Sequence, residues 1–365
     1  MFLEKVKELI NEGCKIGAFP GACFSIITKD GRYMDFVGLK AKYPKEEENS
    51  IDTIYDMASV TKVSTTTTCL LKLIEDGRVR LFDRVNLYLK DFKYDDIMIY
   101  HLVTHTSGLI ECLPHPTTII SREEALRLLY EQPQTFSVGT DMRYSDLNYI
   151  LLGLIIEKVT GMSLDKYAKE VMYDPLEMKD TCFNPIDTLR CAPTEERNDD
   201  IVKDIVRGKV HDETAYILGG AAGHAGMFST ISDMSNFLSM ILNDGLYKGK
   251  RFLSSSTIDK LFTPLAKKEV GNSCLYLQRS IGWIVKDYNS SAGDLTSNET
   301  IDHTGFTGTN VWVDRKNEVA FCMLSNRVHP TRKNILHIAL RAKVANYIIA
   351  HLPEIKEEIK RGYSN

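Results

Sequence analysis

A serine and a lysine lie three residues apart in the segment Ser59-Val60-Thr61-Lys62, which has the pattern S-x-x-K. On a helix these two positions share a face, so the Lys62 amine can reach the Ser59 hydroxyl. A serine hydroxyl is a weak nucleophile until a neighbouring base takes its proton, and a buried lysine with a lowered pKa can be that base. If Ser59 begins the helix, the free backbone N–H groups there also favour a developing oxyanion. The pattern suggests acyl transfer by a serine nucleophile.

S-x-x-K alone is weak evidence, because a chain of this composition contains such spacings by chance. A second copy, Ser163-Leu164-Asp165-Lys166, follows Gly161 and is typical of a helix N-cap.

Two further triplets change this assessment. Tyr144-Ser145-Asp146 precedes a predicted helix, and His303-Thr304-Gly305 enters a strand-rich segment. A tyrosine beside a lysine can relay a proton, and the backbone N–H of Phe306, at the end of a strand, can point at an oxyanion. A serine nucleophile, a lysine–tyrosine base system and two backbone donors make a complete set for acyl transfer.

The order S-x-x-K, Y-x-N and [K/H]-T-G resembles that of serine β-lactamases and penicillin-binding proteins. The chain is most similar to the branch with class C β-lactamases, D-alanyl-D-alanine carboxypeptidases and related esterases. The likeness runs from about Phe19 to Pro330 and is strongest in three segments, Met57–Lys62, Leu102–Leu109 and His303–Gly308.

This resemblance implies a role for each matched residue. Ser59 would be the acylated nucleophile, with Lys62 and Tyr144 as its general-base system. The backbone N–H groups of Ser59 and Phe306 would form the oxyanion hole. The residues expected to contact the substrate are Asp146, His303, Thr304, Gly305 and His224.

The chain departs from the family pattern at two of these positions. Asp146 stands where the family usually has asparagine, and an ionised aspartate can accept hydrogen bonds but not donate them. Its charge should raise the pKa of Lys62 and so move the base role toward Tyr144. His303 stands where many relatives have lysine; it should be mostly neutral at pH 7 and gain charge toward acid. We therefore expect weak recognition of free carboxylates and poor β-lactam hydrolysis.

Other polar groups are interpreted as structural. His101 and His105 have the spacing of a zinc helix, but Leu102 replaces the glutamate of H-E-x-x-H, so His105 is expected to tie a turn by side-chain hydrogen bonds. The glycine-rich segment 219–226 lacks a Rossmann pattern, which argues against a phosphate site. For His211-Asp212-Glu213 a structural role is favoured over substrate contact. No metal and no organic cofactor is expected.

The composition limits the partners. The 365 residues include 45 basic and 49 acidic side chains, and the net charge of −4 argues against a nucleic-acid binder. The longest apolar run, 149–156, is far shorter than the about 18 residues that cross a membrane. Charged residues from Glu4 onward interrupt any signal-peptide core, and the eight cysteines include no C-x-x-C pair. We expect a cytoplasmic protein with reduced cysteines and no membrane or nucleic-acid partner.

Periodicity and turn signals predict the elements that position these residues. Strands are expected at 22–28 and 32–37, joined by an Asp30-Gly31 hairpin, and at 281–286, 311–314 and 319–324. Helices are expected at 59–76, 121–130, 146–160, 163–172, 231–243 and 331–351, and an amphipathic helix at the N-terminus. Strands at both ends with helices between them indicate one body whose sheet uses both ends of the chain.

The expected fold class is α+β, an α/β sandwich with a helical subdomain. The resemblance specifies it as the β-lactamase/DD-peptidase (transpeptidase-like) fold, with a central antiparallel sheet flanked by helices. We expect a single domain over 1–365, with an α/β part at about 1–80 and 225–351, a mostly helical part at about 81–224, and the active site between them.

The predicted function is that of a serine hydrolase acting through an acyl-enzyme on D-amino-acid-containing or muropeptide-type amides. Its partners would be small molecules or short peptides derived from the cell wall, with β-lactams as acylating ligands. The alternatives are a carboxylesterase, a weak β-lactamase, or a catalytically silent protein that binds peptides or penicillins. The presence of Ser59, Lys62 and Tyr144 together counts against a silent binder.

Overall fold

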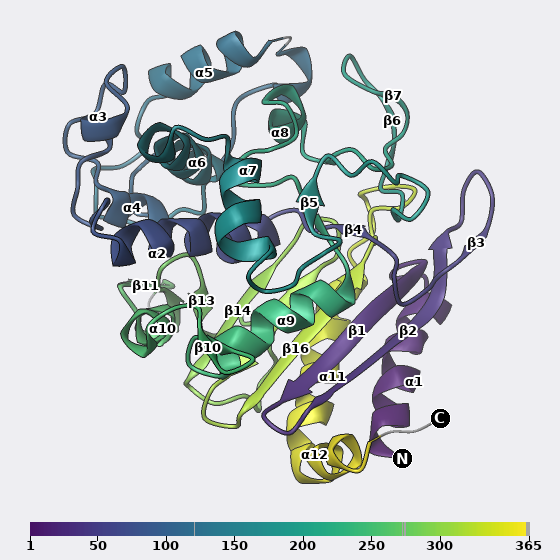
Figure 1. Cartoon of the computed structure of the whole chain (residues 1–365). Helices are drawn as coiled ribbons and strands as arrows, with labels where there is room; N and C mark the ends of the chain where they lie inside the picture. Colours follow the sequence, from purple (N-terminus) through teal and green to yellow (C-terminus); the bar gives the residue numbers. More distant parts are fainter. Residues whose placement is uncertain (120, 272, 274, 363–365) are drawn as a thin grey trace.

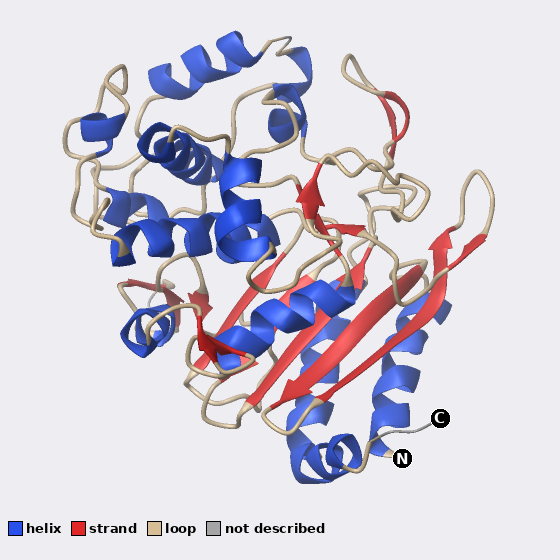
Figure 2. Ribbon diagram, in the orientation of Figure 1, coloured by secondary structure: helices blue, strands red, loops and turns tan. Residues whose placement is uncertain are grey.

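A nine-stranded antiparallel sheet forms the centre of the computed structural model, which describes residues 1–119, 121–271, 273 and 275–362 (Figures 1 and 2). In spatial order its strands are β11 (Ala266–Glu269), β12 (Tyr276–Arg279), β13 (Ile284–Val285), β14 (Thr300–Thr304), β15 (Asn310–Asp314), β16 (Val319–Ser325), β1 (Gly21–Thr28), β2 (Arg32–Ala41) and β3 (Glu47–Glu48).

The two ends of the chain meet in the middle of this sheet. β1 pairs with β16 in the register Cys23↔Leu324, and with β2 through the predicted hairpin, in which the Thr28 N–H donates to the Gly31 carbonyl at 2.8 Å. All eight residues of β1 are buried, because helices cover both faces of the sheet. The predicted central antiparallel sheet with flanking helices is confirmed.

The side chains of β1 pack alternately in two hydrophobic cores, because successive side chains of a strand point to opposite faces of the sheet. Cys23 and Ile27 pack on the side of α9 (Ile231–Leu242), whereas Phe24 and Ile26 pack on the opposite side. That opposite side is covered by α1 (Phe2–Lys15), α11 (His337–Ala350) and α12 (Leu352–Lys360), which lie together behind the sheet in Figure 1.

Most of the remaining helices lie together in the upper left part of Figure 2, away from α1, α11 and α12. They are η1 (Lys62–Thr66), α2 (Thr67–Glu75), α3 (Val85–Tyr88), α4 (Ile99–Val103), η2 (Pro116–Thr118), α5 (Arg122–Glu131), α6 (Asp146–Thr160), α7 (Leu164–Ala168), η3 (Lys169–Tyr173) and α8 (Glu213–Ile217), and α10 (Ser255–Phe262) lies near β14. Three short sheets complete the fold: β4 (Tyr55–Asp56) and β5 (Cys182–Phe183) on either side of β8 (Met227–Ser229), β6 (Glu196–Asn198) with β7 (Lys203–Ile205), and β9 (Leu246–Tyr247) with β10 (Lys250–Arg251).

The segment after Ser59 is helical although its run of β-branched residues disfavours a helix. Every residue from Lys62 to Thr68 is buried, and hydroxyls satisfy nearby carbonyls, as when Thr66 Oγ1 donates to the Gly223 carbonyl at 2.6 Å. Tertiary packing therefore overrides propensity here. The first turn, η1, is π-helical, a local widening that is frequent at functional sites.

Three element predictions need correction. The C-terminal helix begins at His337 rather than at 331 and is followed by α12, whose start is marked by Pro353. Strands β11 and β12 are not among the predicted strands; β11, at the edge of the sheet, has the sequence Ala-Lys-Lys-Glu, which lacks an apolar pattern. Ser163 is the N-cap residue of α7, but its hydroxyl makes no cap bond; Glu157 Oε1 accepts from the Leu164 N–H instead, at 3.1 Å.

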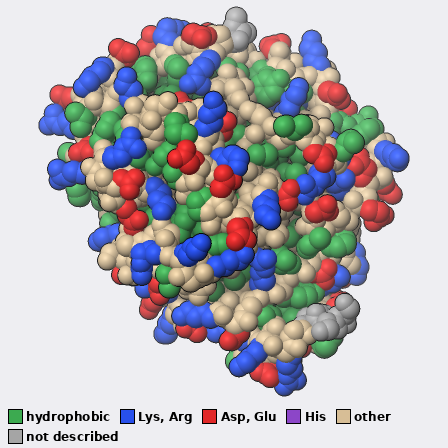
Figure 3. All heavy atoms as spheres, in the orientation of Figure 1, with side chains coloured by type: hydrophobic (Ala, Val, Ile, Leu, Met, Phe, Trp, Pro, Cys, Tyr) green, Lys and Arg blue, Asp and Glu red, His purple; other side chains and the backbone are tan. Residues whose placement is uncertain are grey.

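The surface and the cysteines fit the composition. On the face shown in Figure 3, basic and acidic side chains are interspersed. Seven cysteines are free thiols, and Cys274 lies outside the described residues.

Among the described helices none is alone long and apolar enough to cross a membrane. By length and composition, α6 together with the 164–173 helix would be sufficient, but the pair is bent by 76°. The division of the chain near residues 80 and 224 stays a proposal.

Candidate active site

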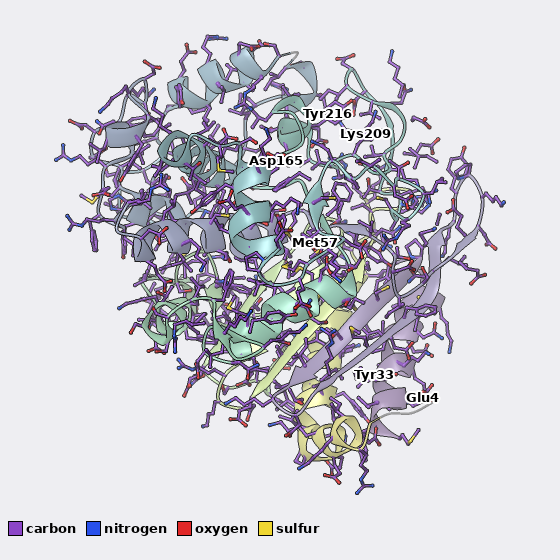
Figure 4. The ribbon with its side chains drawn as sticks, viewed as in Figure 1. Glu4, Tyr33, Met57, Asp165, Lys209 and Tyr216 are labelled. Atoms are coloured by element: carbon purple, nitrogen blue, oxygen red, sulfur yellow. The ribbon has the colours of Figure 1, made fainter. Side chains whose placement is uncertain are left out.

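Ser59 lies where strand β4 turns into the buried helix. The turn places Ala58 at a φ of +46°, a conformation that costs an alanine energy and is tolerated only when the surroundings enforce it. The buried carboxylate of Asp56 does so, accepting from the Ala58 N–H at 2.8 Å and from the His211 N–H at 2.7 Å. Figure 4 labels Met57, two residues before Ser59, between the helices and the sheet. These hydrogen bonds therefore fix the turn that carries Ser59.

Lys62 is 1% exposed and reaches the Ser59 hydroxyl, as the S-x-x-K spacing predicts. Its Nζ atom lies 2.9 Å from Ser59 Oγ, 2.8 Å from the His224 carbonyl and 2.7 Å from Asp146 Oδ1. The first two contacts are hydrogen bonds donated by the ammonium group, and the third is an ion pair.

Tyr144 approaches the same ammonium from the loop before α6, with Lys62 Nζ 5.0 Å from its ring centroid. His105 positions this loop: its Nδ1 accepts from the Ser145 N–H at 3.1 Å, and its ring lies 4.7 Å from that of Tyr144. His105 thus ties a turn by side-chain hydrogen bonds, as expected. His101 Nδ1 likewise accepts a backbone N–H, that of Met98.

The third triplet ends strand β14 beside Ser59. The His303 ring lies 6.1 Å from the Tyr144 ring, and His303 and Thr304 line the same pocket as Ser59. A Cβ atom on Gly305 would lie 2.5 Å from the Met57 carbonyl oxygen and 2.1 Å from Thr309 Oγ1. Gly305 therefore lets the strand approach the backbone that carries the nucleophile.

Two backbone donors face this pocket. Within the described residues, neither the Ser59 N–H nor the Phe306 N–H donates a hydrogen bond. The peptide that follows the Phe306 N–H is held by Arg327, whose Nε donates to the Phe306 carbonyl at 2.7 Å, and the Phe306 ring stacks on the His211 ring with 5.6 Å between their centroids. Fixed donors of this kind are what an oxyanion needs.

Charge decides which side chain can accept the serine proton. Burial alone would lower the pKa of Lys62, but the adjacent Asp146 carboxylate and Tyr144 outweigh it, so the pKa is raised and the ammonium is held. Burial raises the pKa of Tyr144, Asp146 raises it further, and Lys62 together with Ser59 opposes the rise. This agrees with the prediction that the charge of Asp146 raises the pKa of Lys62.

Asp146→Asn tests this electrostatic role. The Asp146 charge raises the pKa of both Lys62 and Tyr144, so its removal should lower both. A general base works only when deprotonated, so the ascending limb of kcat/KM against pH should move to lower pH in the variant. A pH profile from 5 to 10 measures this; an unchanged limb, or one moved to higher pH, would show that Asp146 does not control the base.

His303 is neutral, and its pKa lies further below 7 than that of an ordinary histidine. Burial lowers its pKa well below the usual value, and Arg279 and Lys62 lower it further. The expected gain of charge toward mildly acidic pH is therefore wrong: a proton on His303 would be buried beside two cations.

Arginines that carry no sequence motif line the pocket with Ser59. This pocket, of about 400 Å³, is lined by Ser59, Tyr144, Arg279, Ile284, Asn289, His303, Thr304, Gly305, Phe306, Arg327, Ile335, His337, Ile338 and Arg341. Three of these side chains are arginines and none is a carboxylate. The expectation of weak carboxylate recognition considered His303 and Asp146 alone and did not include these guanidinium groups; it stays a prediction.

His224 does not contact the pocket in the way we expected. Its side chain is 1% exposed, with Nε2 2.7 Å from Asp212 Oδ1, and its contribution to the site is the carbonyl that accepts from Lys62. Asp146, Asp212 and His224 could supply ligand atoms within 4.8 Å of one another, but Lys62 and the Asp212–His224 pair already engage these atoms.

A serine with lysine and tyrosine partners, in a pocket beside an antiparallel sheet, defines a serine hydrolase. The chain belongs to the β-lactamase family, because the family model described as Beta-lactamase matches residues 6–346.

Two curated relatives have names that concern the cell wall. The chain is 30% identical to "N-acetylmuramyl-L-alanine amidase" of Bacillus subtilis (strain 168) over 90% of its length and 81% of that protein. It is 31% identical to "Putative D-alanyl-D-alanine carboxypeptidase" of Salmonella agona (strain SL483) over 76% of its length and 70% of that protein.

Solved structures share the fold. A penicillin-binding protein homologue from Caulobacter crescentus superposes with a TM-score of 0.77 at 16% identity, covering 96% of this chain and 97% of that one. The hydrolase EstCE1, titled as having promiscuous acyltransferase activity, superposes with a TM-score of 0.76 at 19% identity, covering 95% and 98%. At these identities the likeness establishes the fold alone.

Proposed function

We propose that this serine hydrolase cleaves D-amino-acid-containing or muropeptide-type amides that carry a carboxylate next to the scissile bond. The observation that supports this most directly is Arg279. Its Cζ lies 5.7 Å from the Tyr144 ring centroid, its Nη1 is buried without a partner among the described residues, and it lines the pocket with Ser59. Arg279 itself is half-buried, but a guanidinium with one buried and unpaired donor favours an anion beside it.

In the proposed reaction Ser59 Oγ attacks the substrate carbonyl carbon while its proton passes to the phenolate form of Tyr144. Because the pKa of Tyr144 is raised, this form and with it the acylation rate increase toward alkaline pH. Tyr144 takes this role because Asp146 holds Lys62 protonated, and Lys62 donates to Ser59 Oγ throughout. The N–H groups of Ser59 and Phe306 bind the oxyanion. When the C–N bond breaks, Tyr144 returns the proton to the leaving amine, and water then attacks the acyl-serine ester to release the acid.

A carboxylesterase is the second candidate, and the pocket rim favours it. Phe306, Ile335 and Ile338 line the pocket and are 48%, 66% and 58% exposed, so apolar groups of an ester could pack there. The apolar rim does not explain why Arg279 Nη1 has no partner among the described residues. For that reason we prefer the peptide substrate.

Arg279→Met separates the two candidates. The substrates are N-acetyl-D-Ala-D-Ala and its C-terminal amide, which differ only in the carboxylate, together with a neutral nitrophenyl ester. A hydrogen bond to a charged group contributes about 1.5–3 kcal/mol, or roughly tenfold to a hundredfold in kcat/KM. The wild type should prefer the free acid by about this factor, and Arg279→Met should lose the preference while keeping its rate on the ester.

Arg361→Met is the matched control, because it removes an exposed guanidinium at the end of α12. It should leave the preference unchanged. Equal rates on acid and amide in the wild type would contradict the carboxylate specificity, and turnover of the ester alone would select the carboxylesterase.

A further inference from the structure

A second group of basic side chains, two arginines and a histidine, lies at the end of the same pocket where α11 begins. Arg341 and His337 are on the first turns of α11, and Arg327 follows β16. Burial, to which Arg327 adds, lowers the pKa of Arg341 to about 10. Burial, to which Arg341 and Arg327 add, lowers the pKa of His337 to about 3. The group is distinct from Arg279, which interacts with Tyr144, His105 and His303.

Arg341 is buried without a structural partner. It is 7% exposed, and its Nε has no hydrogen-bond acceptor among the residues that the structure describes. His337 is 4% exposed, and its Nδ1 is likewise unsatisfied within the described chain. The nearest acid, Asp302, is already bonded to Ser290 and Ser291. Buried polar groups are normally satisfied, so unsatisfied donors that line a pocket indicate a ligand.

Arg327 differs from Arg341, because its own bonds fix the framework of the pocket. Its guanidinium donates to the carbonyls of Phe306, Arg332 and Asn334 at 2.7 Å each. It therefore adds positive charge at this end of the pocket, while Arg341 Nε and His337 Nδ1 have no hydrogen-bond partner among the described residues.

We propose that Arg341 and His337, beside the fixed charge of Arg327, form a second anion subsite that binds the side-chain carboxylate of an acidic residue on the substrate. This inference rests on the proposed function, in which Arg279 binds the carboxylate next to the scissile bond. One pocket then holds two separated anions, so the preferred leaving residue is a dicarboxylic D-amino acid rather than D-alanine. The exposed Ile335 and Ile338 supply apolar contact for the methylene groups between the two carboxylates.

The test compares N-acetyl-D-Ala-D-Glu with N-acetyl-D-Ala-D-Gln, which have the same shape and the same terminal carboxylate. The wild type should prefer the D-Glu peptide by at least tenfold in kcat/KM. Arg341→Met should reduce this ratio to near one while retaining turnover of the D-Gln peptide. Lys343→Met, which removes an exposed cation from the same helix, should keep the wild-type ratio. Arg341→Lys, which keeps the charge, should restore part of the preference if the methionine variant is poorly folded.

Calorimetric binding of both peptides to Ser59→Ala provides a readout that does not need turnover. The subsite predicts tighter binding of the D-Glu peptide, lost when Arg341→Met is added. Equal binding and equal rates for the two peptides in proteins with Arg341 would overturn the subsite, even if D-Ala-D-Ala is hydrolysed. Failure to hydrolyse any peptide, with selective binding intact, would instead overturn the proposed function and leave the subsite standing.

Discussion

Ser59→Ala is expected to abolish hydrolysis of every substrate while leaving the protein folded. Among the serines that the structure describes, only this one has a buried lysine at 2.9 Å and lies in the pocket with Tyr144 and His303. Removing the nucleophile removes the acyl-enzyme, so kcat should fall to the background of the assay, by about 10⁴-fold or more. Initial rates on a peptide and an ester, with circular dichroism to confirm folding, measure this.

Ser163→Ala is the matched control, because Ser163 belongs to the second S-x-x-K spacing. Its hydroxyl makes no cap bond, so the variant should lose about 0.5 kcal/mol of stability or less and no activity. A folded Ser59→Ala protein with more than trace turnover would refute the nucleophile, and loss of activity in Ser163→Ala would show that the assay reports damage to the fold.

Tyr144→Phe should have the second-largest effect. The change removes only the phenolic oxygen, and the ring can keep its packing on His105 at 4.7 Å. If that oxygen transfers the serine proton, its loss should reduce the acylation rate by about 10²–10⁴-fold, the usual contribution of general-base catalysis. KM should change little, because the phenol acts on the proton and not on the bound ground state.

Single-turnover kinetics on a nitrophenyl ester separates acylation from the later steps. Tyr149→Phe, one turn into α6, serves as its control: Tyr149 is buried and its hydroxyl lies 3.4 Å from Thr67 Oγ1, away from Ser59 in the hydrogen-bond network. Near-normal acylation in Tyr144→Phe would mean that Lys62 is the base by itself, despite the Asp146 carboxylate at 2.7 Å.

The three motifs could be predicted because each consists of characteristic residue types at a fixed spacing, and the three occur in the family's order along the chain. The Ser59–Lys62 pair, Tyr144 and His303 come from three separate segments, and the structure brings them together with Phe306. The sheet could be predicted for the same kind of reason, since β1, β2, β15 and β16 have strong apolar patterns.

The charge of the pocket could not be predicted in this way. Arg279 lies on the short strand β12 and Arg341 on a helix face, and one arginine in such a context is indistinguishable from a surface arginine. Their importance arises from burial without a partner, which depends on how β12 and α11 pack around β14. The protonation of His303 and the side-chain direction of His224 likewise follow from neighbours distant in sequence.

Mass spectrometry of the protein quenched during reaction tests the central claim, acyl transfer to Ser59, most directly. Wild type and Ser59→Ala are each mixed with a nitrophenyl ester and, separately, with a penicillin, quenched in acid and digested. We predict one acyl group per wild-type chain from the ester, located on the peptide that contains Ser59, and no adduct on the variant. Any penicillin adduct should be on the same serine and carry the whole mass of the drug, because opening the lactam ring releases no leaving group. An acyl group on another residue, or an equal adduct on Ser59→Ala, would contradict the assignment of Ser59.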